Sequence, residues 1–321
     1  MVPSLPLTLR ACLSYFMPAG IKTYEVRPNQ SVELLKELHI LTRDGRMNQD
    51  SRRKLKQVYH LFQFIEPLLD ALKAGKNGNA GGADGTDGAN GGITLVDHGA
   101  GKSYLGFILY DLFFKALNDG SHIFGIETRD ELVEKSRDLA KRLGFRGMTF
   151  LNLPVADSIT SSRLPAAVDI VTALHACDTA TDDAIRFALT KHARDIVLVP
   201  CCQAEVAGVL RRNKGKSLGD ALTELWRHPL HTREFGSHLT NVLRCLQLEA
   251  HGYRVNVTEL VGWEHSMKNE LIVAQYRDLP RQRATQRLGE ILERFGLTEL
   301  RERFFVNEQE SCKIPPSAGV V

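Results

Sequence analysis

The sequence lacks the features that would place the chain in a membrane, in an oxidising compartment or on a polyanion through overall charge. No stretch reaches about 18 uninterrupted apolar residues, so no transmembrane helix is predicted. Pro3, Pro6 and Arg10 interrupt the apolar N-terminus, which does not resemble a signal peptide. The six cysteines show no regular disulfide spacing, which favours a reduced, cytoplasmic compartment. With a net charge of only +3, any contact with nucleic acid has to use local basic patches.

Four segments are expected along the chain. Residues 1–73 have apolar residues at helical spacing and predict an N-terminal helical module. Residues 74–92 are rich in glycine and of low complexity, which predicts a flexible linker. The main domain is expected to span 93–277, and a C-terminal helix with a tail to occupy 278–321.

From Ile93 onward, strand-like and helix-like segments alternate. The predicted strands are 93–97, 122–127, 148–153, 168–174, 195–200, 253–261 and 270–276, and the predicted helices between them are 103–117, 130–143, 181–192 and 217–251. This alternation predicts an α/β fold with a doubly wound, mostly parallel sheet of seven strands. The short link before the last strand suits a hairpin, so that strand is expected to be antiparallel.

The first predicted strand ends at Asp97 and leads into a glycine-rich turn that contains Gly99, Ala100 and Gly101. A strand, a turn with room only for backbone and a helix N-terminus form a cradle for a nucleotide. Tyr104 stands where the third glycine of the dinucleotide pattern would be. The spacing D-x-G-x-G therefore fits S-adenosylmethionine better than a dinucleotide.

Acidic residues end the first two predicted strands and follow the third. Asp97 is expected to organise the turn or to reach the amino-acid end of the cofactor through water. Glu127 is expected to accept hydrogen bonds from both ribose hydroxyls, with a cap on the following helix as the alternative. Asp157 is expected either to read the adenine amine or to form a turn.

A second cluster is expected where the fourth and fifth strands end, because ligands of open α/β sheets bind outside the carboxyl ends of strands. Its members are Leu174, His175, Cys177, Asp178, Cys201 and Cys202. One interpretation is a lining of small side chains around the cofactor, with Leu174 and His175 in contact with it. Another is catalysis, with His175 as general base or a cysteine thiolate that attacks a pyrimidine ring. A zinc site has suitable ligand types, but adjacent cysteines are an awkward arrangement, so we expect no metal.

Five segments of this chain resemble the class I S-adenosylmethionine-dependent methyltransferases. They are Asp97–Lys102, Gly125–Glu127, Leu174–Cys177, Pro200–Gln203 and His265–Asn269. The last three resemble the L-H-A-C-G-D, P-C-C and K-N elements of a group known by its methyltransferase domain. The resemblance implies methyl transfer from the sulfonium and the strand order 3-2-1-4-5-7-6. It also shows a departure, since Asp178 stands where the group has glycine.

The acceptor is not fixed by this resemblance. An N-P-P-[FY] element, which would indicate methylation of an amino nitrogen, is missing after the fourth strand. Basic segments at 51–56, 211–216 and 226–231 could bind a phosphate backbone or be no more than solvated surface. RNA is therefore the leading acceptor, and protein and small-molecule acceptors are the alternatives. A non-catalytic module that binds the cofactor within an RNA or protein assembly is the rival from another class.

Overall fold

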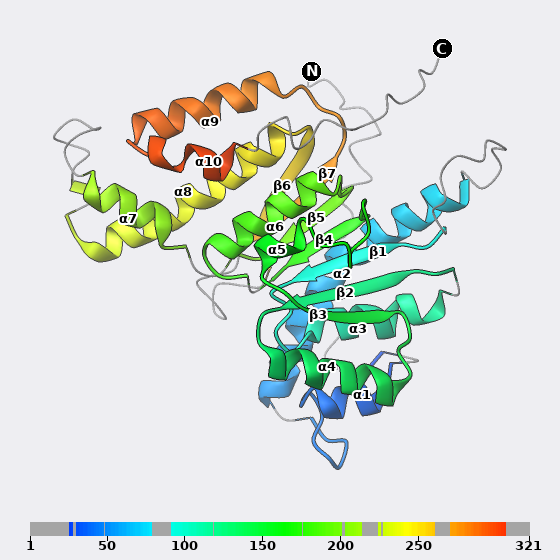
Figure 1. Ribbon diagram of the computed structural model, residues 1–321. Coiled ribbons are helices and arrows are strands. Elements are labelled where there is room, and N and C mark those ends of the chain that lie inside the picture. The colour runs from blue at the N-terminus through cyan, green and yellow to red at the C-terminus, as the bar shows by residue number, and fades with distance from the viewer. Residues whose placement is uncertain are drawn as a thin grey trace, which may run out of the picture.

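A computed structural model describes residues 26–27, 30–47, 49–78, 91–117, 119–174, 176–200, 203–213, 224–225, 227–260 and 270–305. Seven strands form one sheet: β1 Thr94–His98, β2 His122–Glu127, β3 Met148–Asn152, β4 Ile170–Ala173, β5 Asp195–Leu198, β6 Tyr253–Glu259 and β7 Glu270–Tyr276. Their order is β3-β2-β1-β4-β5-β7-β6 (Figure 1). The first five strands pair in parallel, and β7 is antiparallel to both β5 and β6. The predicted fold class and the strand order implied by the resemblance are thereby confirmed.

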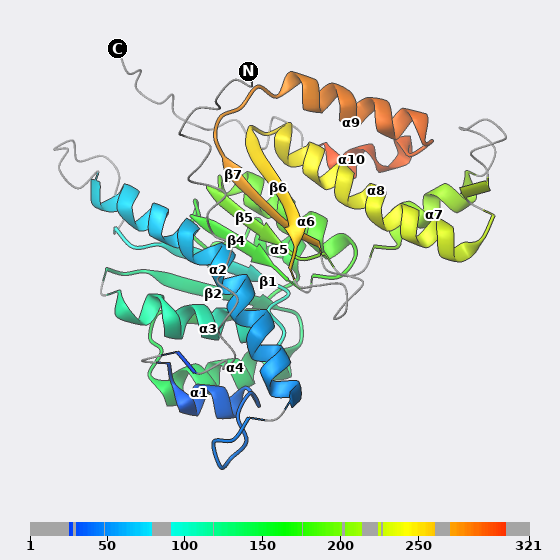
Figure 2. The same cartoon turned by 180° about the vertical axis from the view of Figure 1, so that it is seen from behind.

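Helices cover both faces of this sheet, as the two opposite views show (Figures 1 and 2). They are α1 Val32–Glu37, α2 Gln49–Gly78, α3 Tyr104–Leu112, α4 Asp130–Leu143, α5 Val155–Ser158, α6 Thr179–Thr190, α7 Glu205–Arg212, α8 Pro229–Glu249, α9 Gln282–Arg294 and α10 Arg301–Phe304. Short 3₁₀ turns occupy Phe114–Ala116 and Thr298–Leu300. Apolar side chains of α2, α3 and α4 pack on one face of the sheet, and those of α6 and α8 pack on the other. None of the described helices is long and apolar enough to cross a membrane.

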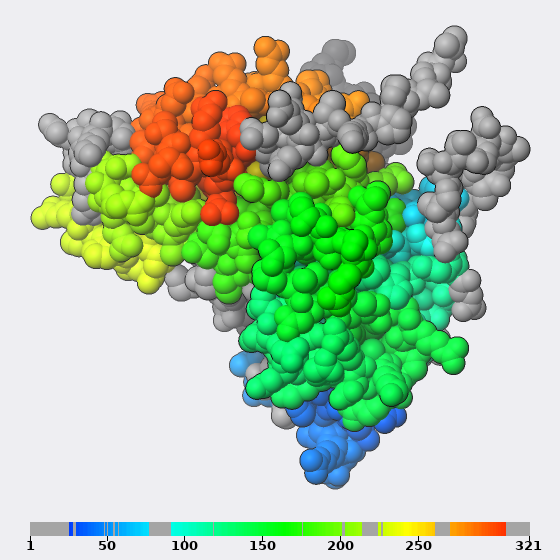
Figure 3. All heavy atoms as spheres, viewed as in Figure 1, coloured from blue at the N-terminus to red at the C-terminus, as the bar shows by residue number. Residues whose placement is uncertain are grey.

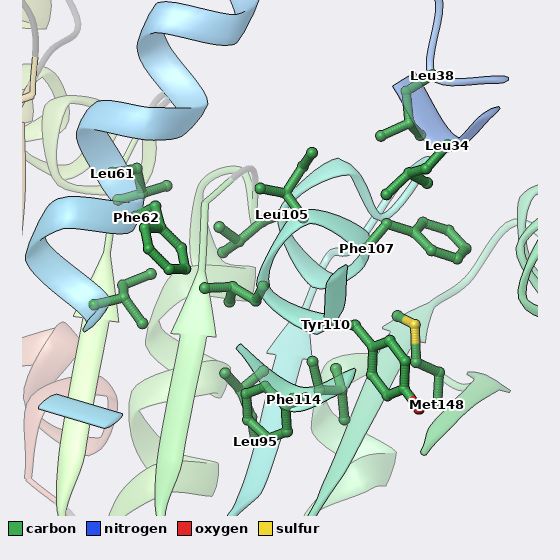
Figure 4. Close-up of a cluster of buried hydrophobic side chains, with 14 of the residues drawn as sticks. Leu34, Leu38, Leu61, Phe62, Leu95, Leu105, Phe107, Tyr110, Phe114 and Met148 are labelled. Carbon is green, nitrogen blue, oxygen red and sulfur yellow. The ribbon is translucent and has the colours of Figure 1, made fainter. Parts of the chain in front are cut away.

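The N-terminal helices share the core of the sheet. Phe62 of α2 and Leu34 of α1 belong to one buried cluster with Leu105 of α3 and Leu95 of β1 (Figure 4). Helix α2 also runs to Gly78, five residues past the predicted end of the helical module at residue 73. Two contacts of Lys76 hold its last turn in place. The Lys76 ammonium donates a hydrogen bond to the Gly92 carbonyl at 2.7 Å, and it forms an ion pair at 2.9 Å with Asp169, the residue just before β4. The N-terminal helices thus form a layer of the main domain.

A third hydrophobic cluster lies outside the two sheet faces. It joins α7 and α8 to the C-terminal helices α9 and α10, with Leu243, Leu292 and Phe304 at its centre. The space-filling view shows α9 and α10 lying directly against α7 (Figure 3). The single predicted helix 217–251 is corrected here: α8 begins at Pro229, and α7 precedes it. Proline suits the first turn of a helix because its missing N–H would have no partner there.

Candidate cofactor-binding site

A cavity of about 860 Å³ lies at the carboxyl ends of β1, β2, β4 and β5. Five residues that the sequence predicted for the cofactor site line this cavity: the turn residues Gly99, Ala100 and Gly101 and the acids Asp97 and Glu127. Leu174, Ala176 and Cys177 line it from the end of β4, and Val199 lines it from the end of β5. The cavity therefore lies where open parallel sheets bind their ligands.

The turn after β1 has a backbone that only glycine adopts without cost. Gly99 and Gly101 have φ values of +64° and +58°, in the left-handed region. A Cβ on Gly99 would lie 3.2 Å from the backbone of Ala176, so a side chain there would push the turn away from β4. The N–H of Ala100 donates to the Ile126 carbonyl at 3.0 Å. The two glycines thus let the turn pass close to both neighbouring strands.

Glu127 is the most extensively hydrogen-bonded group of the cavity. Its carboxylate accepts from the N–H of Gly101 at 2.8 Å, from the N–H of Thr128 at 3.0 Å, and from the N–H and Nε of Arg129, both at 3.0 Å. Burial raises the pKa of this carboxyl, but the hydrogen bonds from Arg129 and Gly101 outweigh burial and lower the pKa to about 2. Glu127 is therefore ionised at neutral pH, and it lines the cavity as a hydrogen-bond acceptor.

Asp97 is held differently. Its side chain is buried and accepts a hydrogen bond from the Thr172 hydroxyl at 2.6 Å. Burial raises the pKa of Asp97 to about 7, with the Thr172 hydrogen bond acting in the opposite direction. Burial therefore favours the protonated form of this carboxyl more than exposure to water would. A cationic group brought into the cavity would favour the ionised form.

His98, next to Asp97, is a buried residue that the sequence reasoning did not single out. Side chains alternate along a strand, so His98 points to the opposite face and stacks edge-on against Phe187 at 4.5 Å between ring centroids. Its side chain is fully buried, and neither ring nitrogen has a hydrogen-bond partner among the described residues. Burial lowers the pKa of His98 to about 3, so the ring is neutral.

Helix α2 supplies a wall that the sequence did not predict. Val58 and Leu61 of α2 line the cavity together with Tyr104 and Leu105 of α3, and Leu260 lines it from the end of β6. The available signal was the apolar stripe of α2 at helical spacing, but a stripe alone does not say against what it packs. These residues give the cavity an apolar share of its wall.

The predicted cluster at the ends of β4 and β5 is only partly described. Cys177 is exposed, and it lines the cavity with Leu174. His175, Cys201 and Cys202 lie outside the described residues, so their predicted roles stay predictions. Within the described part of the chain, no group of three or more His, Cys, Asp or Glu side chains could hold a metal ion.

Asp178 and Asp157 lie away from the cavity lining. Asp178 has φ +50° and ψ −122°, a conformation in which the resembling group's glycine is at ease. Its carboxylate accepts from the N–H of Ala204 at 2.9 Å, just before α7. Asp157 is exposed in α5, while Leu153 and Val155 line the cavity at that point. The predicted contact of Asp157 with adenine stays a prediction.

Comparisons with known proteins agree with this geometry. Residues 53–209 match the model of a family described as a methyltransferase domain. None of the curated proteins compared with the chain matches it. Among solved structures, magnesium protoporphyrin IX methyltransferase from Synechocystis with bound S-adenosylhomocysteine is 14% identical, with a TM-score of 0.41, over 76% of this chain and 94% of that one. An rRNA methylase from Streptococcus thermophilus is 9% identical, with a TM-score of 0.37, over 59% of this chain and 88% of that one. Identities this low assign neither an acceptor nor an activity.

The residues of the cavity fit S-adenosylmethionine on their own chemistry. The glycine turn and the ionised carboxylate of Glu127 both line the cavity, and they are the kinds of group that bind the backbone-facing and hydroxyl-bearing parts of a nucleoside. The buried carboxyl of Asp97 lies in the same cavity and suits a cationic or hydrogen-bond-donating group. The strand order and the match of residues 53–209 to the methyltransferase-domain model support a class I methyltransferase fold with S-adenosylmethionine as its cofactor.

Proposed function

We propose that this protein is an active S-adenosylmethionine-dependent methyltransferase and that its acceptor is RNA. The cavity that joins the glycine turn and Glu127 to the ends of β4 and β5 carries the first part of the proposal. The cofactor supplies an electrophilic methyl group on its sulfonium. What the protein adds is position, because a reacting atom held in line with that methyl group no longer has to find it by diffusion.

The residues divide this work between them. The turn at Gly99 and Gly101 and the carboxylate of Glu127 bind and orient, since their backbone and acceptor atoms face the cavity. The apolar wall of Val58, Leu61 and Leu260 excludes water from the other part. Such a wall suits a planar ring better than a charged side chain. His175, which follows β4, is the proposed general base for an acceptor that has to lose a proton.

RNA is favoured by a second groove beside the cavity. This groove, of about 960 Å³, lies between α1 and α4 and shares Lys102 and Tyr104 with the cofactor cavity. Lys135 and Lys141 of α4 line it as well. Within the described part of the chain, none of these three lysines forms an ion pair with a carboxylate.

This arrangement matches the needs of a nucleic-acid strand that enters the cavity. Ammonium groups bind phosphates, and an aromatic ring such as Tyr104 is a stacking surface for a base. The acidic members of the groove are Glu37, which pairs with Arg142 at 3.1 Å, and Asp138. The lysines thus exceed the unpaired acids along a path that ends at the cofactor.

Transfer of a labelled methyl group tests the proposal directly. The protein is incubated with tritium-labelled S-adenosylmethionine and total RNA from cells in which the gene is deleted, and the product is treated with nuclease or with protease. We expect label that nuclease releases and protease does not. Label released only by protease would overturn the RNA acceptor, and no transfer to RNA, protein or small molecules would favour the non-catalytic module.

The groove has its own test. Exchanging Lys135 and Lys141 together for glutamate should weaken RNA binding by about tenfold or more and flatten its dependence on salt, because fewer counterions are released. S-adenosylhomocysteine affinity should not change. Lys73→Glu, at an exposed position near the far end of α2, is the matched control. Equal RNA affinity in the double variant and the control would contradict the groove as the RNA path.

A further inference from the structure

Helix α8 carries a buried polar network on the opposite face of the sheet from α2. The Arg244 side chain is fully buried, and its Nε and Nη2 donate to the two oxygens of Asp182 at 2.7 and 2.8 Å. Nη2 also donates to the carbonyl of Asp178 at 2.9 Å. Arg244 thus fixes the start of α6 and the residue before it.

Asn241, one turn earlier on α8, is the hub of the network. Its Oδ1 accepts from Gln203 at 3.0 Å and from Nη1 of Arg244 at 3.3 Å. Its Nδ2 donates to the Glu270 carboxylate at 2.7 Å. The Ser237 hydroxyl, one turn earlier again, donates to the other end of the Gln203 amide at 2.7 Å. Asn241 therefore joins two chain segments to α8, at Gln203 and Glu270, and Arg244 joins a third, at Asp178 and Asp182.

Those three segments lie close to strand ends that line the cavity, since Cys177 and Val199 line it and the start of β7 pairs with the end of β5. Asp178 directly follows Cys177, which lines the cavity, and Gln203 directly follows Cys201 and Cys202. Glu270 begins β7. A further bond, from the N–H of Ala204 to the Asp178 carboxylate at 2.9 Å, links the first two segments to each other. Figure 2 shows α8 running alongside β6.

Stability alone is a weak reason for such a network. Removing Arg244 and Asp182 from water is costly, and a buried ion pair can often be replaced by apolar residues without loss of stability. Apolar residues, however, do not fix the direction and length of each contact as hydrogen bonds do. The network instead fixes where the ends of β4, β5 and β7 lie relative to one another.

We propose that Asn241 and Arg244 are positioning residues that set the ends of β4 and β5 for methyl transfer. Neither residue lines the cavity, and their hydrogen bonds to Asp178 and Gln203 are the links through which they act on it. This inference rests on the proposed function, because it assigns the network to the acceptor side of that reaction. It predicts that the network governs turnover and leaves cofactor affinity alone.

A charge exchange at the Asn241–Glu270 contact tests this. Asn241→Asp keeps the oxygen that accepts from Gln203 and Arg244, but it sets a second carboxylate against Glu270 where a donor stood. We expect turnover of tritium-labelled S-adenosylmethionine on the RNA described above to fall about 10- to 100-fold, the effect of a displacement of about an ångström. Adding Glu270→Gln restores a donor and an acceptor with reversed roles, so the double variant should recover most of the turnover.

Asn256→Asp, the same exchange on an exposed residue of β6, is the control. S-adenosylhomocysteine affinity, measured by calorimetry, should be the same in all four proteins. Turnover of Asn241→Asp equal to that of the control would overturn the proposal, and so would a parallel loss of cofactor affinity or failure of the double variant to recover.

Hydrogen–deuterium exchange keeps the test independent of the acceptor. With S-adenosylhomocysteine bound, the backbone amides of 176–180 and 203–206 should exchange faster in Asn241→Asp and return to the wild-type rate in the double variant. Unchanged exchange in Asn241→Asp would overturn the positioning role even if no acceptor were found. Absence of any methyl transfer by the wild-type protein, with this exchange pattern present, would overturn the proposed function and leave the network as the device that orders these segments.

Discussion

The backbone N–H of Gly101 donates a 2.8 Å hydrogen bond to the carboxylate of Glu127, which joins the turn after β1 to the end of β2. The same carboxylate accepts from the N–H of Arg129 at the start of α4. One ionised group therefore joins the glycine turn to the start of α4. Cofactor hydroxyl groups that bind Glu127 would do so at oxygens already oriented by the protein, which reduces the cost of ordering the site.

Glu127→Gln should weaken cofactor binding. The substitution removes the negative charge and replaces one carboxylate oxygen with an NH₂ group, which donates and does not accept. The N–H of Gly101 or of Arg129 therefore loses its acceptor. Each charge-assisted hydrogen bond contributes about 1.5–3 kcal/mol, so the Kd for S-adenosylhomocysteine should rise at least about tenfold in calorimetry. Glu134→Gln, on the exposed face of α4, serves as control. Equal affinities in the two variants would disprove the cofactor role of Glu127.

Gly99→Ala should disturb the turn in two ways, through the positive φ of residue 99 and through a clash of the added Cβ. The new Cβ lies 3.2 Å from the Cα and N of Ala176, which belong to the backbone and cannot rotate away. Gly144→Ala is a matched control, since Gly144 has a similar φ of +68° and no atom within 4 Å of the added Cβ. Both should lose about 1–2 kcal/mol of unfolding free energy through the left-handed conformation. Only Gly99→Ala should also lose affinity for S-adenosylhomocysteine.

His98→Leu should stabilise the protein, and the gain should grow in acid. Removing a buried group without hydrogen-bond partners contributes about 1–3 kcal/mol at neutral pH. In the unfolded chain the pKa of His98 returns to about 6.5, whereas burial holds it near 3 in the fold. The unfolded state therefore binds the proton first, and wild-type stability falls as pH drops below about 6.5.

Denaturation of His98→Leu and wild type at pH 8 and pH 5 measures this difference. The advantage of the variant should be about 2 kcal/mol larger at pH 5, from a slope of about 1.4 kcal/mol per pH unit below the unfolded pKa. His238→Leu, at an exposed position of α8, should show no such change with pH. An advantage of His98→Leu that stays constant with pH would contradict a neutral, buried ring.

A chain that starts at Gly91 should fail to fold, although it contains the whole sheet. It lacks Leu55, Phe62, Ile65 and Leu69 of α2, all fully or almost fully buried against the rest of the domain. Loss of large core side chains costs about 2–5 kcal/mol each, so four of them remove as much as the whole stability of an ordinary domain. Circular dichroism and one-dimensional NMR of the shortened chain check this. Dispersed methyl signals and a cooperative thermal transition would show instead that the helices are a separate module.

His175→Ala should lower turnover by roughly 10²–10⁴-fold and leave cofactor affinity unchanged, as expected when a general base is lost. Cys201→Ser and Cys202→Ser should each retain most of the activity. A protein–RNA adduct trapped with a fluorinated pyrimidine would show that a cysteine thiolate is the nucleophile and that His175 is not the base.

Metal analysis of the same preparations should give well under one zinc per chain, and a value near one would indicate a metal site.

Local patterns were sufficient for the sheet and for one side of the cavity. Most of the parallel strands are short apolar runs, and Asp97, Gly99 and Glu127 stand at or just after strand ends. Such features depend on neighbours in sequence, so they can be read without the fold. The strand order came from the resemblance, because pairing between distant strands leaves little trace in a single sequence.

The remaining parts of the site depend on contacts between distant residues. The sequence shows that α2 has an apolar face, but not that Val58 and Leu61 reach the cofactor cavity. Asn241 and Arg244 look like ordinary polar residues of a helix, and only the fold shows that they are buried. Asp178 was a departure from the expected glycine, and its link to Ala204 explains where its carboxylate goes.

The position of α2 in the core has a consequence for synthesis of the chain. Helix α2 ends at Gly78, yet its apolar face belongs to a cluster that includes Leu271 of β7. The ribosome makes about 190 further residues before that strand exists, which takes roughly 10–40 s at ordinary rates of translation. During this time the helix cannot reach its final packing, however stable it is by itself. The nascent chain therefore exposes part of the apolar face of α2 until β7 has been made, and chaperones that recognise amphipathic helices have time to bind it.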